Sequence, residues 1–151
     1  QAWNNLQSVN QAEEASLVPP KTDLSLVCEV DSFRMQQVFR NLFENAIAAC
    51  SDSAQIKISI SETEIHGRPA LGIAIKDNGP GLSEEQCQRA FEPFYTSKQK
   101  GTGLGLAIVQ RIIEAHNGQI EIGSSPEPGA TFLITLPRQS RLREQAEAQS
   151  Q

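Results

Sequence analysis

The sequence predicts an α+β fold in which helices pack on one face of a mixed, mostly antiparallel sheet. Two segments, near residues 33–50 and 104–115, repeat apolar residues at helical spacing. Several shorter segments alternate apolar and polar residues, which is typical of half-buried strands. Because turns separate most of these strands, we expect one layer of strands and one layer of helices around a single core.

The composition fits one domain of ordinary solubility. The chain has 151 residues and a formal net charge of −5, which argues against nucleic acid or an anionic membrane as the main partner. It has no apolar run of membrane-spanning length and no signal-peptide core. Its cysteines are widely spaced and form no CxxC pair, which fits a reducing compartment. We therefore expect a cytoplasmic domain without direct membrane contact, even if its parent protein is membrane-anchored.

The first predicted strand and helix follow a polar N-terminal segment. Residues 1–20 are helix-compatible until a Pro-Pro pair interrupts them, and we interpret them as a connecting segment. Leu24–Val30 alternates apolar and polar residues and is predicted to be a strand. Asp31 or Ser32 then caps a long helix that continues to about Cys50.

The rest of the chain predicts a hairpin, two more helices and a second pair of strands. In chain order the expected elements are strand Gln55–Ile65, a turn at His66–Pro69, strand Leu71–Ile75, a short helix after Ser83, a helix from Gly103 to about Asn117–Gly118, strand Gln119–Gly123, a turn at Pro126–Gly129 and strand Ala130–Leu136. We expect the domain to occupy residues 21–137. Residues 138–151 are polar and are interpreted as a tail.

A glycine-rich run, Gly101-Thr102-Gly103-Leu104-Gly105, leads into the second long helix. A helix N-terminus presents unpaired N–H groups and the positive end of the helix dipole, which suit phosphate. The run fits neither the P-loop pattern nor the dinucleotide fingerprint, because it lacks the Gly-Lys pair and has a bulky residue at the last small position. At this point phosphate binding and simple close packing both remain open.

The long helix near residues 33–50 carries polar residues opposite its apolar face. Asn41 and Asn45 are neighbours at i and i+4, and Glu44 lies beside them. Asparagine is a poor helix former, and amide and carboxylate oxygens suit Mg²⁺. The pattern favours metal or phosphate contact over the alternative, an ordinary solvated face.

A turn-like segment, Asp77-Asn78-Gly79-Pro80-Gly81, follows the predicted Leu71–Ile75 strand. It can be a tight turn and nothing more. It can also hold the Asp77 carboxylate at a strand end, with glycines that let a flat ring lie against the backbone. An ionised carboxylate only accepts hydrogen bonds, so it would pair with the amino group of adenine and disfavour the carbonyl of guanine. Such a bond contributes about 1.5–3 kcal/mol.

A third candidate segment combines aromatic residues with a basic loop. Phe91 and Phe94 flank a proline, and Tyr95-Thr96-Ser97-Lys98 follows. The phenylalanines can serve packing alone. Alternatively they anchor a lid from which Lys98 reaches a terminal phosphate as a point charge.

Taken together, four segments resemble the catalytic domain of histidine kinases. Asn41–Ala46 resembles its N box, Asp77–Leu82 its first glycine box, Phe91–Phe94 its F box and Gly101–Leu106 its second glycine box. The four occur in the family's order and cover most of the chain. The short lid and the residues after the N box are most similar to sensor kinases of the nitrogen-regulation type.

The resemblance implies a Bergerat fold, the α/β sandwich shared with the ATPase domains of gyrase, Hsp90 and MutL, and the cofactors ATP and Mg²⁺. It implies that Asn45 binds Mg²⁺, that Asn41 lies near the phosphates and that Asp77 takes the adenine amino group. The glycines of both boxes would wrap the triphosphate. Glu44 would polarise the attacking group or orient the imidazole nucleophile, and Lys98 would act with Glu44 and Asn45 in catalysis.

The implied function is transfer of the ATP γ-phosphoryl group to a histidine on a separate dimerisation domain, for relay to the receiver domain of a response regulator. His66, in a predicted turn, and His116, at a helix end, do not sit in a phosphoacceptor-like helix. We therefore expect a monomeric catalytic fragment whose substrate histidine lies elsewhere. Two alternatives share the fold: a serine kinase of the anti-sigma type, and a non-catalytic module in which ATP only reshapes the lid for a partner.

Overall fold

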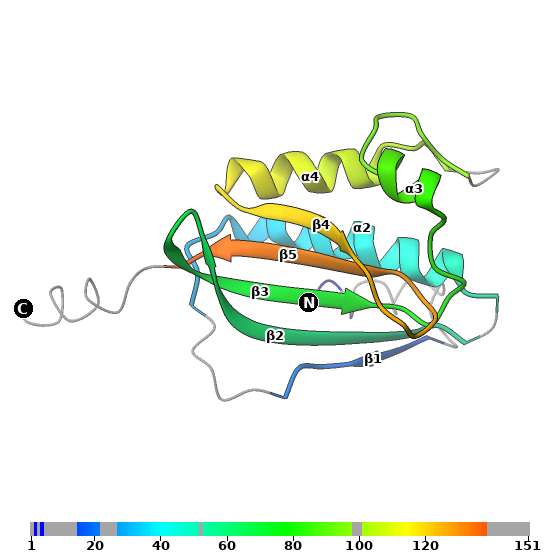
Figure 1. Cartoon of the computed structure of the whole chain (residues 1–151), viewed down its shortest axis with the longest axis horizontal. Coiled ribbons are helices and arrows are strands. Elements are labelled where there is room, and N and C mark those ends of the chain that lie inside the picture. The colour runs from blue at the N-terminus through cyan, green and yellow to red at the C-terminus, as the bar shows by residue number, and fades with distance from the viewer. Residues whose placement is uncertain are drawn as a thin grey trace, which may run out of the picture.

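The computed structural model describes residues 2, 4, 15–21, 27–51, 53–97 and 101–138. It has two layers, a five-stranded sheet and, on one of its faces, two long helices, α2 (Ser32–Ala49) and α4 (Gly105–Ala115) (Figure 1). A short helix, α3 (Glu84–Arg89), lies beyond the end of the sheet near the start of α4. The predicted α+β class is confirmed.

The sheet is mixed and mostly antiparallel, as predicted. Its strands are β1 (Ser16–Val18), β2 (Gln55–Ile65), β3 (Arg68–Lys76), β4 (Gln119–Gly123) and β5 (Thr131–Pro137), in the spatial order β1-β2-β3-β5-β4. Among these strands of the described residues, only the β1–β2 pair is parallel. The β2–β3 hairpin turns on His66 and Gly67, whose φ angles of 50° and 71° match the positive values of a type I′ turn. Arg68 and Pro69, expected in the turn, belong to β3.

The first strand is not where the sequence pattern placed it. Val27–Val30, the described part of the expected Leu24–Val30 strand, is irregular, and residues 22–26 lie outside the described part. Cys28 and Val30 alternate with polar residues because they pack against the core from an unpaired segment. The edge strand is β1 instead, inside the range that we assigned to the connecting segment. Its register pairs Ser16 with Gln55.

The helix boundaries follow their capping residues. The side chain of Asp31 accepts a hydrogen bond from Arg34 N at 3.0 Å and begins α2, and Ser83 forms the predicted capping box with Gln86 at α3. Helix α4 ends in a Schellman motif, in which the residue with positive φ (56°) is Asn117. No helix in these described segments is both long and apolar enough to cross a membrane.

The core lies between the helices and the sheet. Its fully buried side chains come from both layers: Leu42 and Val38 of α2, Val109 and Ile113 of α4, Ile56 of β2 and Ile134 of β5. Burying one such aliphatic side chain stabilises the fold by about 1.5–3 kcal/mol. Because this apolar seam fixes the rotation of α2, the polar side of α2 faces the gap between α2 and the start of α4.

His116 ties the far ends of the two long helices together. Its Nδ1 lies 2.7 Å from the Ile112 carbonyl oxygen, to which it donates, and its Nε2 accepts from the backbone N–H of Asp31 at 3.0 Å. The predicted helix-end position of His116 is therefore confirmed, and its ring serves a structural bridge between α2 and α4.

Candidate functional site

One cleft brings the three candidate segments together with the glycine-rich run. Its volume is about 620 Å³. It opens between the polar side of α2, the loop after β3, the segment after α3 and the start of α4. Its walls are formed by Asn41, Glu44, Asn45, Ala48, Ala49, Asp77, Pro80, Gly81, Leu82, Gln86, Ala90, Tyr95, Thr96, Ser97, Gly101, Thr102, Gly103, Gly105, Leu106, Ala130 and Phe132. The volume lies within the range of pockets that hold cofactors and drug-sized ligands.

Asp77 is the buried charged residue of this cleft. It follows β3 directly and its exposed fraction is 6%. Its Oδ1 accepts two backbone hydrogen bonds, from Gly79 N at 2.9 Å and from Ala130 N at 3.0 Å. The backbone N–H of Asp77 donates to the carbonyl of Ala130 at 3.0 Å. Since both bonds to the carboxylate use Oδ1, the second oxygen, Oδ2, is left for a ligand in the cleft.

Glycines allow the backbone around Asp77 to close this tightly. Gly129 has a φ of 108°, and a Cβ there would lie 1.9 Å from the carbonyl oxygen of Asp77. Gly81 has a φ of 79°, and its Cβ would approach the Gly129 carbonyl at 3.2 Å. The sequence singled out Gly79 and Gly81 but read Gly129 only as a turn residue. Its contact with Asp77 joins segments about fifty residues apart, so local sequence patterns carry no signal for it.

The predicted polar side chains of α2 all line the cleft. Asn41, Glu44 and Asn45 lie on the same side of the helix, as their spacing requires. The Asn41 Oδ1 is 3.8 Å from the position that a Cβ on Gly105 would occupy, so the Asn41 amide lies beside the first turn of α4. The structure thus brings Asn41 next to the helix N-terminus that we expected to bind phosphate, and Asn45 lines the same cleft.

The glycine-rich run forms the entry to α4. Gly103 has a φ of 69°, and a Cβ there would lie 2.5 Å from the carbonyl carbon of Phe94. Leu104 is the N-cap residue and makes no side-chain capping bond, in contrast to the caps of α2 and α3. The first N–H groups of α4 are therefore open to an anionic ligand.

The segment after α3 closes the remaining side of the cleft. Phe91 is partly buried against the core, as an anchor should be, whereas the Phe94 side chain is 76% exposed. Phe94 holds the segment through its backbone instead, because its N–H donates to the Gly103 carbonyl at 2.9 Å. Arg89 stacks over the Tyr95 ring at 4.3 Å from the centroid.

The charge balance of the cleft leaves room for cations. Glu44 and Asp77 are its carboxylates, and no lysine or arginine is among its lining residues in the described segments. Lys98, the expected phosphate-binding cation, lies outside the described residues, so its role stays a prediction. The described residues also contain no cluster of three His, Cys, Asp or Glu side chains that could hold a metal alone. The amide and carboxylate oxygens on the polar side of α2 are donors of the type that suits Mg²⁺.

Next to the cleft, the Cys50 thiol supports the loop that carries Asp77. The pKa of Cys50 is raised, mainly by burial and further by the nearby Asp77 carboxylate. A raised pKa keeps the thiol protonated, so it can donate to Asn78 Oδ1 at 3.2 Å. Local sequence patterns carry no signal for this contact between Cys50 and Asn78.

Comparison with known proteins identifies the family. Residues 30–140 match the sequence profile described as histidine kinase-, DNA gyrase B-, and HSP90-like ATPase. The chain belongs to this ATPase family. The matched residues include the Asp77 loop, the polar side of α2 and the glycine-rich entry to α4. The family that the sequence motifs indicated is therefore confirmed.

Relatives place the chain with the histidine kinases in this family. It is 40% identical over 114 residues to sporulation kinase A of Bacillus subtilis (strain 168), covering 76% of this chain and 18% of that kinase. It is 36% identical over 137 residues to the sensor histidine kinase ZraS of Klebsiella oxytoca, covering 89% of this chain and 29% of ZraS. The chain thus spans less than a third of either kinase.

A solved structure gives the same result for the fold. The catalytic domain of histidine kinase ThkA is 30% identical, with a TM-score of 0.76 over 91% of this chain and 88% of that one. The chain therefore corresponds to the nucleotide-binding ATPase domain of a sensor histidine kinase, as the sequence indicated.

Proposed function

We propose that this domain binds Mg-ATP and transfers the γ-phosphoryl group to a histidine on a separate dimerisation domain, for relay to a response regulator in the cytoplasm. The observation that carries the proposal is the Asp77 carboxylate, buried at a strand end and bonded through Oδ1 alone. A fixed, buried acceptor in the wall of a cleft of about 620 Å³ suits the amino group of adenine.

The adenine specificity follows from the acceptor chemistry. Asp77 Oδ2 can accept from the exocyclic N–H of adenine, whereas the guanine carbonyl at that place would face it as a second acceptor. The two backbone donors on Oδ1 keep the carboxylate from turning to relieve that repulsion. A bond to a charged acceptor contributes about 1.5–3 kcal/mol, which corresponds to a preference of roughly ten- to more than a hundredfold.

The other end of the cleft supports a triphosphate. The open N–H groups at the start of α4 and the amide of Asn41 would contact phosphate oxygens. Asn45 would hold the Mg²⁺ ion, which neutralises phosphate charge when bound. One helix N-terminus contributes only about 0.3–1 kcal/mol per anion at an exposed site, so we assign the remaining stabilisation to Lys98 and the ion together.

The transfer step needs positioning more than covalent chemistry. The bond from the γ-phosphorus to the bridging oxygen breaks while a bond to an imidazole nitrogen of the incoming histidine forms. Glu44 is exposed at the cleft wall. Its carboxylate would accept a hydrogen bond from the N–H of that imidazole and hold the ring in line with the breaking bond.

The histidines of this chain do not fit the acceptor role. His66 lies in the β2–β3 turn, and both ring nitrogens of His116 are engaged in the bridge between α2 and α4. We therefore place the phosphoacceptor on the dimerisation domain of the parent protein, and we expect the isolated domain to be monomeric.

The proposal is tested by calorimetry and by phosphoryl transfer. Wild-type protein should bind ATP more tightly than GTP and require Mg²⁺ for full affinity, and Asp77→Asn should lose the preference for ATP. Wild-type protein should also label an added histidine-containing dimerisation domain in a linkage that acid cleaves. Acid-stable labelling of a protein serine would point to the serine kinase alternative. Binding without any transfer would favour the non-catalytic module.

A further inference from the structure

The side chain of Asn78 ties the Asp77 loop to the segment that joins α2 to β2. Its Oδ1 accepts from Gln55 N at 2.7 Å and from Cys50 Sγ at 3.2 Å, and its Nδ2 donates to the Ser53 carbonyl at 3.2 Å. Asn78 is not among the residues that line the cleft, whereas its neighbour Asp77 is. One carboxamide thus makes three contacts, all to one short segment outside the cleft.

This segment continues directly from the cleft wall. It begins where α2 ends, and Ala49, the last residue of α2, lines the cleft. A Cβ on Gly79 would lie 3.4 Å from both the Cβ and the carbonyl oxygen of Ala49, so the Asp77 loop also packs on the end of the helix. Asn45 and Asn41 lie one and two turns earlier on α2. The helix therefore links the anchor of the loop to the polar residues of the other end.

We propose that Asn78 is a positioning residue that fixes Asp77 relative to α2 and so couples the adenine end of the cleft to its phosphate and metal end. This inference rests on the proposed function of the cleft. Hydrogen bonds weaken steeply when their geometry is lost. If the loop could shift on α2, Asp77 Oδ2 would no longer meet the adenine amino group while the phosphates are held beside Asn41 and Asn45.

The chemistry of the contact requires an amide. Asn78 presents an acceptor to two donors, Gln55 N–H and the Cys50 thiol, and a donor to the Ser53 carbonyl. An aspartate would place a second acceptor against that carbonyl and a second charge beside Asp77. An alanine would remove all three bonds but would not alter any residue that lines the cleft.

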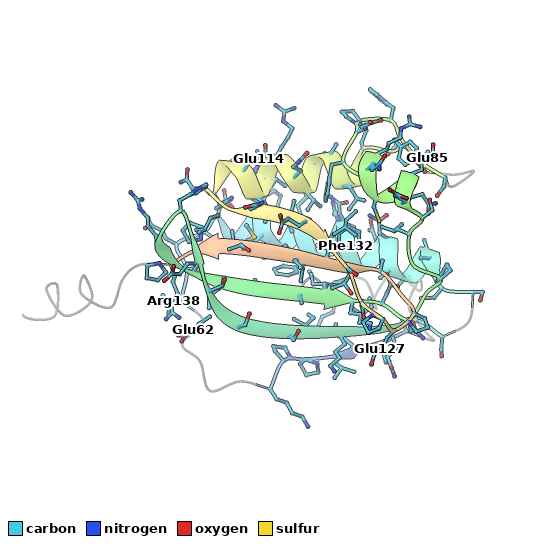
Figure 2. All side chains as sticks on the ribbon, viewed as in Figure 1. Glu62, Glu85, Glu114, Glu127, Phe132 and Arg138 are labelled. Atoms are coloured by element: carbon cyan, nitrogen blue, oxygen red, sulfur yellow. The ribbon has the colours of Figure 1, made fainter. Side chains whose placement is uncertain are left out.

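The test compares nucleotide preference in Asn78→Ala and in a matched control. The control is Glu62→Gln, which breaks the 2.9 Å ion pair between Glu62 and Arg138. Figure 2 shows that pair at one end of the sheet. Glu127, which lies in the same turn as Gly129 and so marks the side of the Asp77 loop, is at the opposite end. For each variant, calorimetry gives the ratio of the GTP to the ATP dissociation constant, and thermal melting gives the stability.

Positioning and mere stability predict different results. We expect Asn78→Ala to lower the ratio of the GTP to the ATP dissociation constant about tenfold relative to wild type. The reason is that a displaced Asp77 would lose most of the difference in binding free energy between ATP and GTP. Glu62→Gln should keep the wild-type ratio even if its melting temperature falls. Cys50→Ala removes one of the three bonds, leaves the carboxamide in place and should lower the ratio by about threefold.

Each failure has a distinct signature. If wild-type protein shows no preference for ATP, the proposed function fails and this inference fails with it. If wild-type protein prefers ATP and folded Asn78→Ala shows the same ratio with only a lower melting temperature, Asn78 is structural and the inference is overturned. Should Asn78→Ala not fold, an unchanged ratio in Cys50→Ala would overturn it in the same way.

Discussion

The two ends of the cleft are built from different kinds of contact. At the Asp77 end, backbone bonds from Gly79 and Ala130 fix the carboxylate, and Asn78 fixes the loop itself. At the other end, the bond from Phe94 N–H to the Gly103 carbonyl joins the segment after α3 to the glycine-rich run, and α4 begins without a side-chain cap. If the proposed function holds, the protein therefore completes its adenine acceptor alone, whereas the open N–H donors at its phosphate end need the anionic oxygens of a ligand.

The largest effect is expected from Gly129→Ala, at the preformed end. The added Cβ would meet the Asp77 carbonyl oxygen at 1.9 Å, and the φ of 108° is strained for alanine. Strained backbone alone costs about 1–3 kcal/mol, and the clash adds to it. Chemical denaturation should show a lower free energy of unfolding, with ATP binding lost as well. Gly67→Ala, where a Cβ at positive φ would meet nothing within 4 Å, controls for strain without a clash.

At the open end, Gly103→Ala should separate phosphate binding from adenosine binding. A Cβ there would lie 2.5 Å from the Phe94 carbonyl carbon and would push the segment after α3 away from the start of α4. We expect ATP affinity to fall about tenfold while adenosine affinity stays near the wild-type value. Calorimetry with both ligands checks this. An equal loss for adenosine and ATP would contradict this prediction, because it would mean that the added Cβ also displaces the Asp77 end.

A smaller effect on stability alone is expected from Asp31→Ala. Asp31 caps α2 at the end of the helix away from the Asp77 loop, through its bond from Arg34 N at 3.0 Å. Loss of an N-cap side chain costs about 1 kcal/mol. Thermal melting should detect the change, and the ATP dissociation constant should not move. A clear loss of ATP affinity would show that the cleft depends on the far end of α2.

The smallest effect concerns acid stability at the turn between β4 and β5. Lys76 pairs with Glu127 and donates to Ser125 Oγ at 3.0 Å, and the bond from Lys76 holds the pKa of Glu127 below its usual value. A lowered folded-state pKa means that this contribution is present above the usual carboxyl range and disappears as the pH falls through the folded-state value. Glu127→Gln should therefore flatten the loss of stability on acidification. An unchanged acid profile would show that this exposed pair contributes nothing.

Much of the fold could be predicted because its signals are local. Alternation defined β2 and β4 to the residue, and Asp31 and the Ser83 capping box marked where two helices begin. The first strand could not be placed, because β1 has only three residues and its pairing partner, β2, is far along the chain. Alternation in Val27–Val30 arose from packing against the core without sheet pairing.

The site was predictable to the same extent. Asn41 and Asn45 stood out as poor helix formers one turn apart on the polar side of a helix, and Asp77 as a carboxylate in a glycine-rich turn after a strand. The structure places all three around one cleft. The support for Asp77 could not be predicted, because its second donor is a backbone N–H of Ala130, which carries no side-chain signal. The bonds of Asn78 were hidden for a similar reason, since two of its partners are backbone atoms on another loop.

The most direct test of the preformed adenine end is adenosine binding without metal. Adenosine lacks phosphates, so it reports the Asp77 end alone. We predict that wild-type protein binds adenosine in preference to guanosine with an affinity that Mg²⁺ does not change, while the added affinity of ATP depends on Mg²⁺. Two-dimensional NMR titrations of the labelled domain would measure both. Adenosine and guanosine bound equally, or adenosine bound only with Mg²⁺, would contradict the account.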